Sequence, residues 1–577
     1  MQIKLNTNKT FKWKVRKIGV IGPGIVGMPM AALLANAKIR IGTEQPAKVL
    51  VVQRNSKNSG WKVDAINRGK SVIGGIEPGL DEITEKSVKD GTLSASWDYA
   101  SLSDADVILV SIQTDKNGFG PDYGPLLGGL TSLAKALRKK PADNIPLIIF
   151  ESTLAPSSMA TIIKDHFEQY GLIEGKDILL GNSPNRVMPG RLVERVTESD
   201  KLVAGLHPET PRMIREIYKY IVTRGALHIT NSLSAEVTKT LENAYRDVRI
   251  GFSAEMARFC DKNDIDFYAV RDEVNRKLAQ EDAASGDPNS VPSGGILVPT
   301  IGVGGHCLPK DGILLWWRKY QAGVDTSNSL ILHSRIINDD SPRQTIELFE
   351  RNFGQINGKK IALLGAAYRF NSEDTRNSPS LQFALQCLDK GCKISIHDPF
   401  VKIKDQNLEE YNLTPYFTND IEEAVKDAEY LVIGTAHKYY HEQVQNIVSS
   451  APKLTGILDA ANTYRADDIE SLGKQYIGIG RGKKLPEPEF IDFIYDSFRL
   501  MERGVGNEVQ QICNYLNEHY AKNEFNKVKF LDVQHLASSC STGCEIADTG
   551  PIHQVPEYYG FKSQLVEKAF SNQMEKV

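Results

Sequence analysis

The chain has 577 residues, of which 41% are hydrophobic and 24% charged, a composition typical of large globular proteins. Its 69 Lys and Arg residues nearly balance 72 Asp and Glu residues, which argues against nucleic acid as the main partner. No apolar run reaches the length of about 18 residues that a membrane span needs, and the basic N-terminus lacks the features of a signal peptide. We therefore expect a cytoplasmic protein without a membrane span.

Seven cysteines are scattered along the chain, and an odd, scattered set favours reduced thiols in a cytosolic enzyme. Cys540 and Cys544 lie close together, with His535 and His553 nearby. Their spacing does not match a zinc site, and no second cysteine pair completes one. We expect a disordered or surface tail here and no metal.

Short apolar runs alternate with helical segments over about the first 220 residues, which is typical of a parallel α/β sheet. Apolar residues then recur at helical spacing from Ser232 to about Asn263, and this pattern predicts one long helix. A loop rich in Gly, Pro and Ser follows, and a second helical run is predicted from about Ser327 to Asn352. The strand–helix alternation returns at Lys359, so we predict a second α/β unit.

A glycine loop follows the first predicted strand and opens a helix, in the sequence Gly22-Pro-Gly24-Ile25-Val26-Gly27. In a dinucleotide-binding loop the first glycine makes the turn, the second lets the backbone approach a pyrophosphate, and the third allows close packing. The alternative is an unrelated glycine turn. The position between strand and helix favours dinucleotide binding.

The second strand ends in Gln53 and Arg54, where an acidic residue would normally bind the ribose hydroxyls of NAD. An amide beside an arginine would also suit a 2′-phosphate. NAD is the expected cofactor, and NADP stays an alternative.

A second glycine-rich loop, GVGGHCLPKD, spans residues 302–311 and contains Cys307. Pro309 suits the first turn of a helix, so Cys307 should lie at a helix N-terminus, which favours the thiolate. Asp311 follows one helical turn later, and a carboxylate near a thiolate can act as a general base. A lone cysteine is usually an inert buried residue. The glycines and Asp311 favour a nucleophile instead.

The predicted long helix carries Lys239 and Asn243, which are spaced four residues apart and so share one face. Both side chains could stabilise an oxyanion. The alternative is a solvated lysine on a helix surface. The cysteine loop makes the catalytic interpretation the better one.

Together these segments resemble the UDP-glucose/GDP-mannose dehydrogenase family, from about Lys17 to Gly482. The resemblance extends to IEPGLDE (76–82), DVILVSIQTD (106–115), ESTLAPSS (151–158), KTLENAYRDVRIGFSAEMA (239–257), the cysteine loop, and GAAYRFNSEDTRNSPS (365–380). It implies an α/β fold of two Rossmann-like domains joined by a long central helical segment on which subunits dimerise. The expected domains are an NAD-binding domain at 1–220, a central helical domain at 221–345, a nucleotide-sugar domain at 346–485, and a C-terminal extension at 486–577 whose role the sequence does not assign.

The resemblance also implies chemistry, in which the primary alcohol at C6 of a nucleotide sugar is oxidised twice by NAD and ends as a carboxylate. Cys307 would capture the intermediate aldehyde as a thiohemiacetal and then carry a thioester. Lys239 and Asn243 would stabilise the oxyanion, and Asp311 would serve Cys307 or the hydrolytic water. Further residues implied for the site are Thr114 and Thr153 for the cofactor, with Thr153 also ordering a water, and Asn185, Arg186, Gly304, Gly305, Arg369 and Arg376 for the substrate.

The chain departs from the family pattern at several positions. Asn185 stands where a glutamate that can assist proton transfer is usual, and Arg369 stands where a lysine is common. A usual arginine is missing from the segment Asp459-Ala-Ala-Asn462. These changes favour a divergent enzyme with an unusual sugar.

Sequence motifs indicate part of the identity of the substrate. GVGGHC and the frame from Ser183 to Gly190 are similar to the branch that oxidises UDP-N-acetylhexosamines, whereas LPKD is more like the UDP-glucose branch. We favour UDP-GlcNAc or UDP-ManNAc over UDP-glucose or GDP-mannose. Two other classes remain: a β-hydroxyacid dehydrogenase that removes two electrons, and a binding protein for nucleotide sugars that has lost catalysis.

Overall fold

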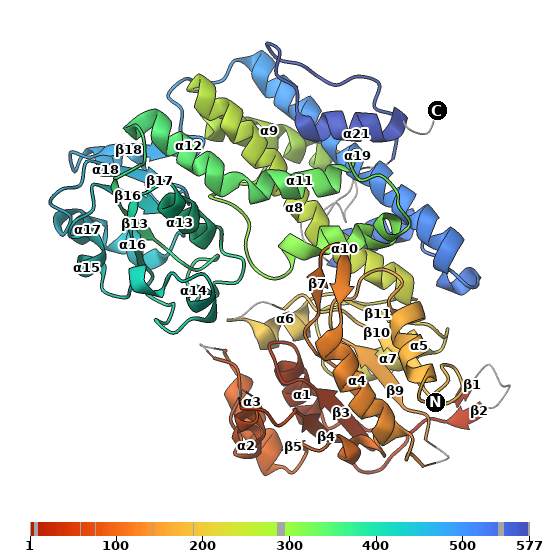
Figure 1. Ribbon diagram of the computed structural model, residues 1–577. Helices are drawn as coiled ribbons and strands as arrows, with labels where there is room; N and C mark the ends of the chain where they lie inside the picture. Colours follow the sequence, from red (N-terminus) through yellow and green to blue (C-terminus); the bar gives the residue numbers. More distant parts are fainter. Residues whose placement is uncertain are drawn as a thin grey trace. The chain divides into compact units, whose positions relative to one another are not determined.

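The computed structural model describes residues 2–4, 10–57, 59–74, 77–141, 144–187, 190–284, 295–540, 547 and 549–574 (Figure 1). Cys544, residues 188–189 and most of the predicted Gly/Pro/Ser-rich loop therefore lie outside the described residues. The chain divides into two compact units. Unit 1 holds Met1–Glu242, Leu314–Val324 and Gln510–Thr542, and unit 2 holds Asn243–Ile313, Asp325–Val509 and Gly543–Val577.

Unit 1 contains an eight-stranded sheet in the order β12-β11-β10-β9-β6-β3-β4-β5. Neighbouring strands are parallel except β10 and β11, which are antiparallel. The central strands are continuous runs of buried aliphatic residues, as expected for a parallel sheet covered on both faces. The strands are β3 (Lys17–Ile21), β4 (Lys48–Val52), β5 (Leu93–Ser96), β6 (Val107–Val110), β9 (Leu147–Phe150), β10 (Leu179–Asn182), β11 (Lys201–Gly205) and β12 (Leu227–Asn231).

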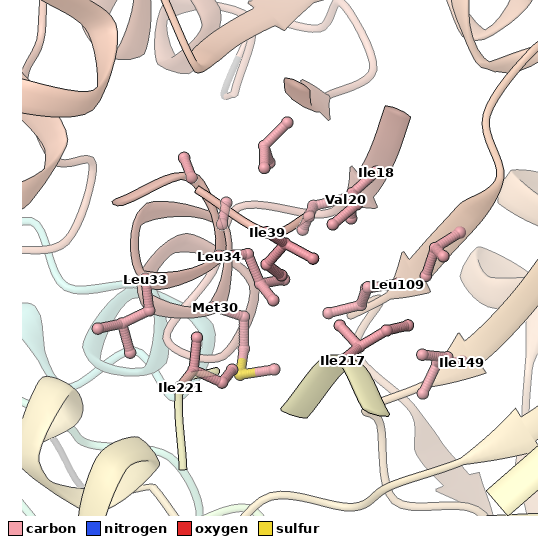
Figure 2. Close-up of a cluster of buried hydrophobic side chains, with 14 of the residues drawn as sticks. Ile18, Val20, Met30, Leu33, Leu34, Ile39, Leu109, Ile149, Ile217 and Ile221 are labelled. Carbon is pink, nitrogen blue, oxygen red and sulfur yellow. The ribbon is translucent and has the colours of Figure 1, made fainter. Parts of the chain in front are cut away.

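Alternating side chains of this sheet point into two separate hydrophobic layers. Val20, Leu109 and Ile149 pack against α1 and α7 on one face (Figure 2). Ile108 and Ile148 pack against α4 on the other face. The helices around the sheet are α1 (Gly27–Asn36), α2 (Trp61–Asn67), α3 (Leu80–Lys89), α4 (Gly124–Leu137), α5 (Lys164–Glu168), α6 (Leu192–Glu198) and α7 (Thr210–Tyr218), with the short turns η1 (Tyr99–Leu102) and η2 (Met159–Ile163).

Smaller elements complete unit 1. Two antiparallel hairpins pair β1 (Gln2–Lys4) with β2 (Thr10–Lys12), and β7 (Asp115–Asn117) with β8 (Gly120–Asp122). The C-terminal extension adds η4 (Glu524–Asn526) and α20 (Phe530–Cys540), and α20 packs on β11.

Unit 2 contains a six-stranded parallel sheet in the order β15-β14-β13-β16-β17-β18. Its two faces also carry separate hydrophobic layers. The strands are β13 (Lys360–Leu364), β14 (Lys393–His397), β15 (Phe417–Thr418), β16 (Tyr430–Ile433), β17 (Gly456–Asp459) and β18 (Gln475–Gly478). The helices around them are α13 (Pro379–Asp389), α14 (Gln406–Glu410), α15 (Ile421–Val425), α16 (Lys438–Glu442), α17 (Val444–Ser449) and α18 (Ala466–Glu470), with the turn η3 (Thr414–Tyr416).

Long helices form the rest of unit 2. The part of α8 (Ser232–Asn263) that belongs to unit 2 packs against α19 (Pro488–Tyr520), where Phe252 meets Phe498 edge-to-face and Tyr245 bonds to Glu502 at 2.5 Å. Glu508 of α19 accepts hydrogen bonds from the first turn of α11 (Leu330–Asp339). The other helices are α9 (Phe267–Ala284), α12 (Ser341–Phe353), α21 (Gln564–Met574) and the start of α10 (Leu308–Gln321), whose residues from Leu314 onward belong to unit 1.

The predicted α/β fold with two Rossmann-like domains and a helical central segment is confirmed. The long helix predicted from Ser232 to about Asn263 is α8. The second predicted helical run, from about Ser327 to Asn352, consists of two helices, α11 and α12, which meet at Asp340. Pro342 lies in the first turn of α12, where backbone N–H groups have no partner within the helix, so its missing N–H costs nothing. In one uninterrupted helix the same position would need an N–H group to donate to a carbonyl one turn earlier.

None of the helices in the described part of the chain is both long and apolar enough to cross a membrane.

Candidate active site

The glycine loop of unit 1 lies between β3 and α1, as predicted. Gly22 has a φ of +87°, and a side chain on Gly27 would lie 2.2 Å from the carbonyl oxygen of Gly22. A side chain on Gly24 would meet nothing within 4 Å, so the backbone there borders open space. Ile25 and Val26 complete the loop, and Ile25 is exposed. The loop thus fits a pyrophosphate at a helix N-terminus.

Gln53 and Arg54 follow β4, at the carboxyl edge where a ribose would bind. The Gln53 amide donates to the Ser59 hydroxyl at 2.9 Å and to the carbonyl of Arg54 at 3.3 Å. Gln53 is therefore turned toward its own loop. The side chain keeps an amide oxygen that can accept from a ribose hydroxyl.

Thr114 and Thr153 lie on two neighbouring loops and are joined by a hydrogen bond. The Thr114 hydroxyl donates to the Thr153 carbonyl oxygen at 2.7 Å. The Thr153 loop is held further along by Glu236, which accepts from the backbone N–H groups of Ser157 and Met159 at 2.8 Å each. The structure thus places both predicted threonines together at the carboxyl ends of β6 and β9.

Lys239 of α8 belongs to a buried group of charges in unit 1. Its ammonium lies 3.8 Å from the Glu242 carboxylate, which also forms an ion pair with Arg186. All three side chains are largely buried. Two cations share one carboxylate, so the group has an excess positive charge that suits a developing oxyanion.

Asn185 lies in a second buried group of unit 1, beside a carboxylate that sequence reasoning missed. Its amide nitrogen donates to Glu151, and its amide oxygen accepts from Lys201 at 2.9 Å. Lys201 also forms an ion pair with Glu151 at 2.9 Å, and the Tyr218 hydroxyl donates to the same carboxylate. Burial lowers the pKa of Lys201 and raises that of Tyr218. Asn185 therefore acts as a neutral link between two buried ions.

Cys307 of unit 2 directly precedes α10, and its carbonyl accepts from the N–H groups of Lys310 and Asp311 at 3.1 and 3.0 Å. Cys307 is exposed, whereas Cys260, Cys387, Cys392, Cys513 and Cys540 are buried. No disulfide joins any of these six residues. Cys307 is thus the accessible thiol among the cysteines that the structure describes, and it lies at a helix N-terminus, which favours the thiolate.

The Asp311 side chain is fully buried and joins two groups of unit 2. One oxygen accepts from the Asn243 amide at 2.6 Å, and the other forms an ion pair with Lys310 at 2.7 Å. Lys310 is itself buried and was not singled out from the sequence. The structure therefore brings Asn243 and Asp311 together, as the sequence suggested, and adds Lys310 to them.

The cysteine loop lies directly against the loop that follows β13. The Gly305 N–H donates to the Arg376 carbonyl at 2.8 Å, and the Asn377 amide donates to the Gly305 carbonyl at 2.9 Å. A side chain on Gly304 would lie 2.5 Å from Tyr368, and one on Gly305 would lie 2.9 Å from the same ring. These two glycines therefore permit the close approach of the loops.

Arginines gather near these loops in unit 2. Burial, with the positive charges of Arg249 and Arg369, lowers the pKa of Arg246. Hydrogen bonding to Asp374 raises the pKa of Arg376. A cluster of arginines suits a diphosphate. Arg246 and Arg249 were not singled out from the sequence.

No group of three or more His, Cys, Asp or Glu residues in the described ranges is arranged to hold a metal ion.

Comparison with known proteins places these features in a family. The NAD-binding domain of the UDP-glucose/GDP-mannose dehydrogenase family matches residues 16–222, its central domain matches 233–340, and its UDP-binding domain matches 362–466. A UDP-N-acetyl-D-mannosamine dehydrogenase of Methanococcus aeolicus is 29% identical, over 83% of this chain and 98% of that protein.

Solved structures agree. An NDP-N-acetyl-D-galactosaminuronic acid dehydrogenase of Methanosarcina mazei is 32% identical with a TM-score of 0.68, covering 81% of this chain and 96% of that one. A UDP-D-ManNAc dehydrogenase of Pyrococcus horikoshii is 26% identical with a TM-score of 0.65, covering 81% and 99%. The chain belongs to the UDP-glucose/GDP-mannose dehydrogenase family. It is an NAD-dependent nucleotide-sugar dehydrogenase.

Proposed function

We propose that the protein oxidises C6 of a UDP-N-acetylhexosamine to the carboxylate with NAD, in two steps of two electrons each. The observation that carries the proposal is the accessible Cys307, which lies at the start of α10 in a glycine loop packed on the arginine-bearing loop after β13. UDP-N-acetylmannosamine is the first substrate to test, because several similar proteins bear that name.

The residues of unit 2 have separate tasks in this proposal. Cys307 adds to the C6 aldehyde and holds it as a thiohemiacetal, which after the second oxidation is a thioester that water hydrolyses. The second N–H of the Asn243 amide, whose first N–H is bonded to Asp311, donates to the oxyanion. Arg369 and Arg376 bind the nucleotide part of the substrate.

In unit 1 the Gly22–Gly27 loop, Gln53, Arg54 and Thr114 would hold the cofactor. Bound NAD supplies the hydride acceptor for both oxidations. Lys239 stabilises the alkoxide that forms at C6, and Thr153 orders a water. Asp311 fixes the Asn243 amide through its hydrogen bond, and it accepts a proton from water during hydrolysis.

The expected domain bounds extend this proposal, with NAD bound by residues 1–220, the nucleophile loop carried by 221–345, and the UDP moiety bound by 346–485. We also infer a cytoplasmic homodimer or larger homo-oligomer, on the resemblance to the family. Sedimentation of the purified protein measures the oligomer directly, and a monomer at all concentrations would overturn that inference.

A substrate panel tests the proposed function. The protein is incubated with UDP-ManNAc, UDP-GlcNAc, UDP-GalNAc, UDP-glucose or GDP-mannose, each with NAD⁺ or NADP⁺, and reduced cofactor and sugar acid are counted. We expect NAD⁺ with an N-acetylated UDP-sugar to give the highest kcat/KM. If the cofactor is reduced only with sugars that lack an acetyl group, the proposed substrate is wrong. If NADP⁺ is preferred over NAD⁺, the proposed cofactor is wrong.

A further inference from the structure

A part of the C-terminal extension lies inside unit 1. The similar proteins are matched over 98–99% of their own length but over only 81–83% of this chain, so about a sixth of this chain has no counterpart in them. The matched family domains end at residue 466. Residues 515–540 lie beyond that point and pack in unit 1.

The first contact of this segment is with Arg318 of α10. The Tyr520 ring lies 4.5 Å from the Arg318 guanidinium, and the Tyr515 hydroxyl donates to the Arg318 carbonyl at 3.4 Å. A cation placed over the face of an aromatic ring is attracted by the ring electrostatically. Tyr520 thus fixes the Arg318 guanidinium, which also forms hydrogen bonds to other residues of unit 1.

Arg318 in turn holds the turn that follows Thr153. Its guanidinium donates to the hydroxyls of Ser157 and Thr161 at 2.7 Å each. Ser157 has a φ of +74°, a left-handed conformation that costs energy in a residue with a side chain and persists only where its surroundings hold it. Tyr520 also lines a small cavity with Ser157 and Glu236. The extension therefore reaches the Thr153 loop through one arginine.

The second contact is made by α20 near the group of charges around Lys239. One face of α20 is apolar, and its Leu536 and Cys540 pack on Leu202, Ala204 and Ala235 of β11 and α8. Burial raises the pKa of Cys540 to about 12, and the charges of Arg186 and Glu242 also act on it. The apolar face of α20 thus lies near the Arg186–Glu242–Lys239 group, and ionic interactions strengthen where water is excluded.

We propose that residues 515–540 are a positioning element for hydride transfer, in which Tyr520 holds the Thr153 loop through Arg318 and α20 shields the charges around Lys239. The proposal rests on the proposed function for its kinetic consequences. Its structural consequences do not depend on any substrate.

The test compares matched variants of the full chain by two readouts. Tyr520→Leu removes the aromatic ring, whereas Tyr520→Phe keeps it. Leu536→Ala opens the buried face of α20, whereas Leu531→Ala changes a side chain on the same helix that is 68% exposed. The first readout is amide hydrogen exchange in the peptide 154–163. The second is kcat with UDP-N-acetylmannosamine carrying hydrogen or deuterium at C6.

We expect Tyr520→Leu to speed exchange in that peptide at least tenfold, with Tyr520→Phe like the wild type. We expect Leu536→Ala to lower kcat about tenfold and to raise the isotope effect on kcat, with Leu531→Ala unchanged. A loss of folded protein alone would lower kcat without raising the isotope effect. Equal exchange in Tyr520→Leu and wild type, or equal kinetics in the two leucine variants, would overturn the proposal.

Failure of the proposed function is seen separately. If the wild type reduces no NAD⁺ with any nucleotide sugar, that function is wrong, and the exchange readout alone decides whether the extension holds the Thr153 loop.

Discussion

Individual side chains of the candidate site are held by buried pairs of opposite charge. Asp311 is paired with Lys310, Glu242 with Arg186, and Glu151 with Lys201. Breaking such a pair from one side leaves an unpaired charge in a place with little water, whereas removing both charges is often tolerated. A comparison of single and double variants therefore separates the effect of these residues on stability from their effect on the reaction.

The Lys310–Asp311 pair provides the first prediction. Lys310→Met alone should lower the free energy of unfolding by about 3–5 kcal/mol, because it leaves Asp311 charged and buried. The double variant Lys310→Met/Asp311→Asn should regain most of that stability but little activity, because Asp311 is needed in the reaction. Urea unfolding and kcat measure the two quantities. Recovery of activity in the double variant would show that Asp311 is needed only for folding.

Asn185 provides the second prediction. Asn185→Asp places a second carboxylate against the buried Glu151, and Lys201 is the cation that contacts both positions. The substitution should lower the free energy of unfolding by about 1–3 kcal/mol. One of the two carboxyl groups should then bind a proton more readily in the folded state, so the loss should be smaller at pH 5 than at pH 8. Asn514→Asp on the exposed face of α19 is the control. Equal melting temperatures for both variants would refute the linking role.

At the scale of the elements, buried carboxylates join the C-terminal helices to the rest of unit 2. Glu255 of α8 accepts from the Ser563 hydroxyl at 3.0 Å and from the Gln564 N–H at 2.5 Å, where α21 begins. Glu508 of α19 caps α11 in the same manner. Burial raises the pKa of Glu255 to about 7. The docking of α21 is therefore sensitive to pH.

The third prediction follows from the sign of this shift. The folded protein retains the Glu255 proton up to about pH 7, whereas the unfolded chain loses it near the usual value of 4.5. The contribution of Glu255 to the free energy of unfolding should therefore be greatest below pH 4.5. It should fall by about 3 kcal/mol as the pH rises from 4.5 to 7.

Glu255→Gln should remove that part of the pH dependence, and Glu567→Gln on the exposed face of α21 should not. Unfolding free energies at pH 5 and pH 8 give the comparison. An unchanged difference between the two pH values in Glu255→Gln would contradict the shift.

The elements differ in how far the sequence predicts them. Helix α8 follows from apolar residues at helical spacing, and strands β16 and β17 follow from short continuous apolar runs. The break between α11 and α12 was missed, although Pro342 marks it. The course of α19 was also missed, since its partners Tyr245 and Phe252 lie far away in the sequence.

The same limit applies to the site. The glycine loops and Cys307 can be predicted from the sequence, because the glycine spacing indicates a tight loop and the proline indicates the start of a helix. Glu151, Lys201 and Lys310 are not, because their importance comes from long-range pairs or from burial that no local pattern encodes. Glu242 could have been found, since it lies three residues after Lys239 on one helix.

The whole molecule combines two Rossmann-like domains, a helical central segment and a C-terminal extension beyond the matched family domains. A single two-electron oxidation would need no covalent nucleophile, whereas oxidation of an alcohol to a carboxylate needs the aldehyde held between steps. We therefore propose that Cys307 carries the sugar through the second oxidation.

One measurement tests this claim most directly, namely the number of NADH molecules formed for each UDP-N-acetylmannosamine consumed, in wild type and in Cys307→Ala. Two NADH for each sugar are expected in the wild type, with a sugar thioester on the Cys307 peptide after rapid acid quenching. The variant should lose at least about a thousandfold in the rate of sugar-acid formation while keeping its melting temperature. One NADH for each sugar, or an unchanged rate in Cys307→Ala, would contradict the claim.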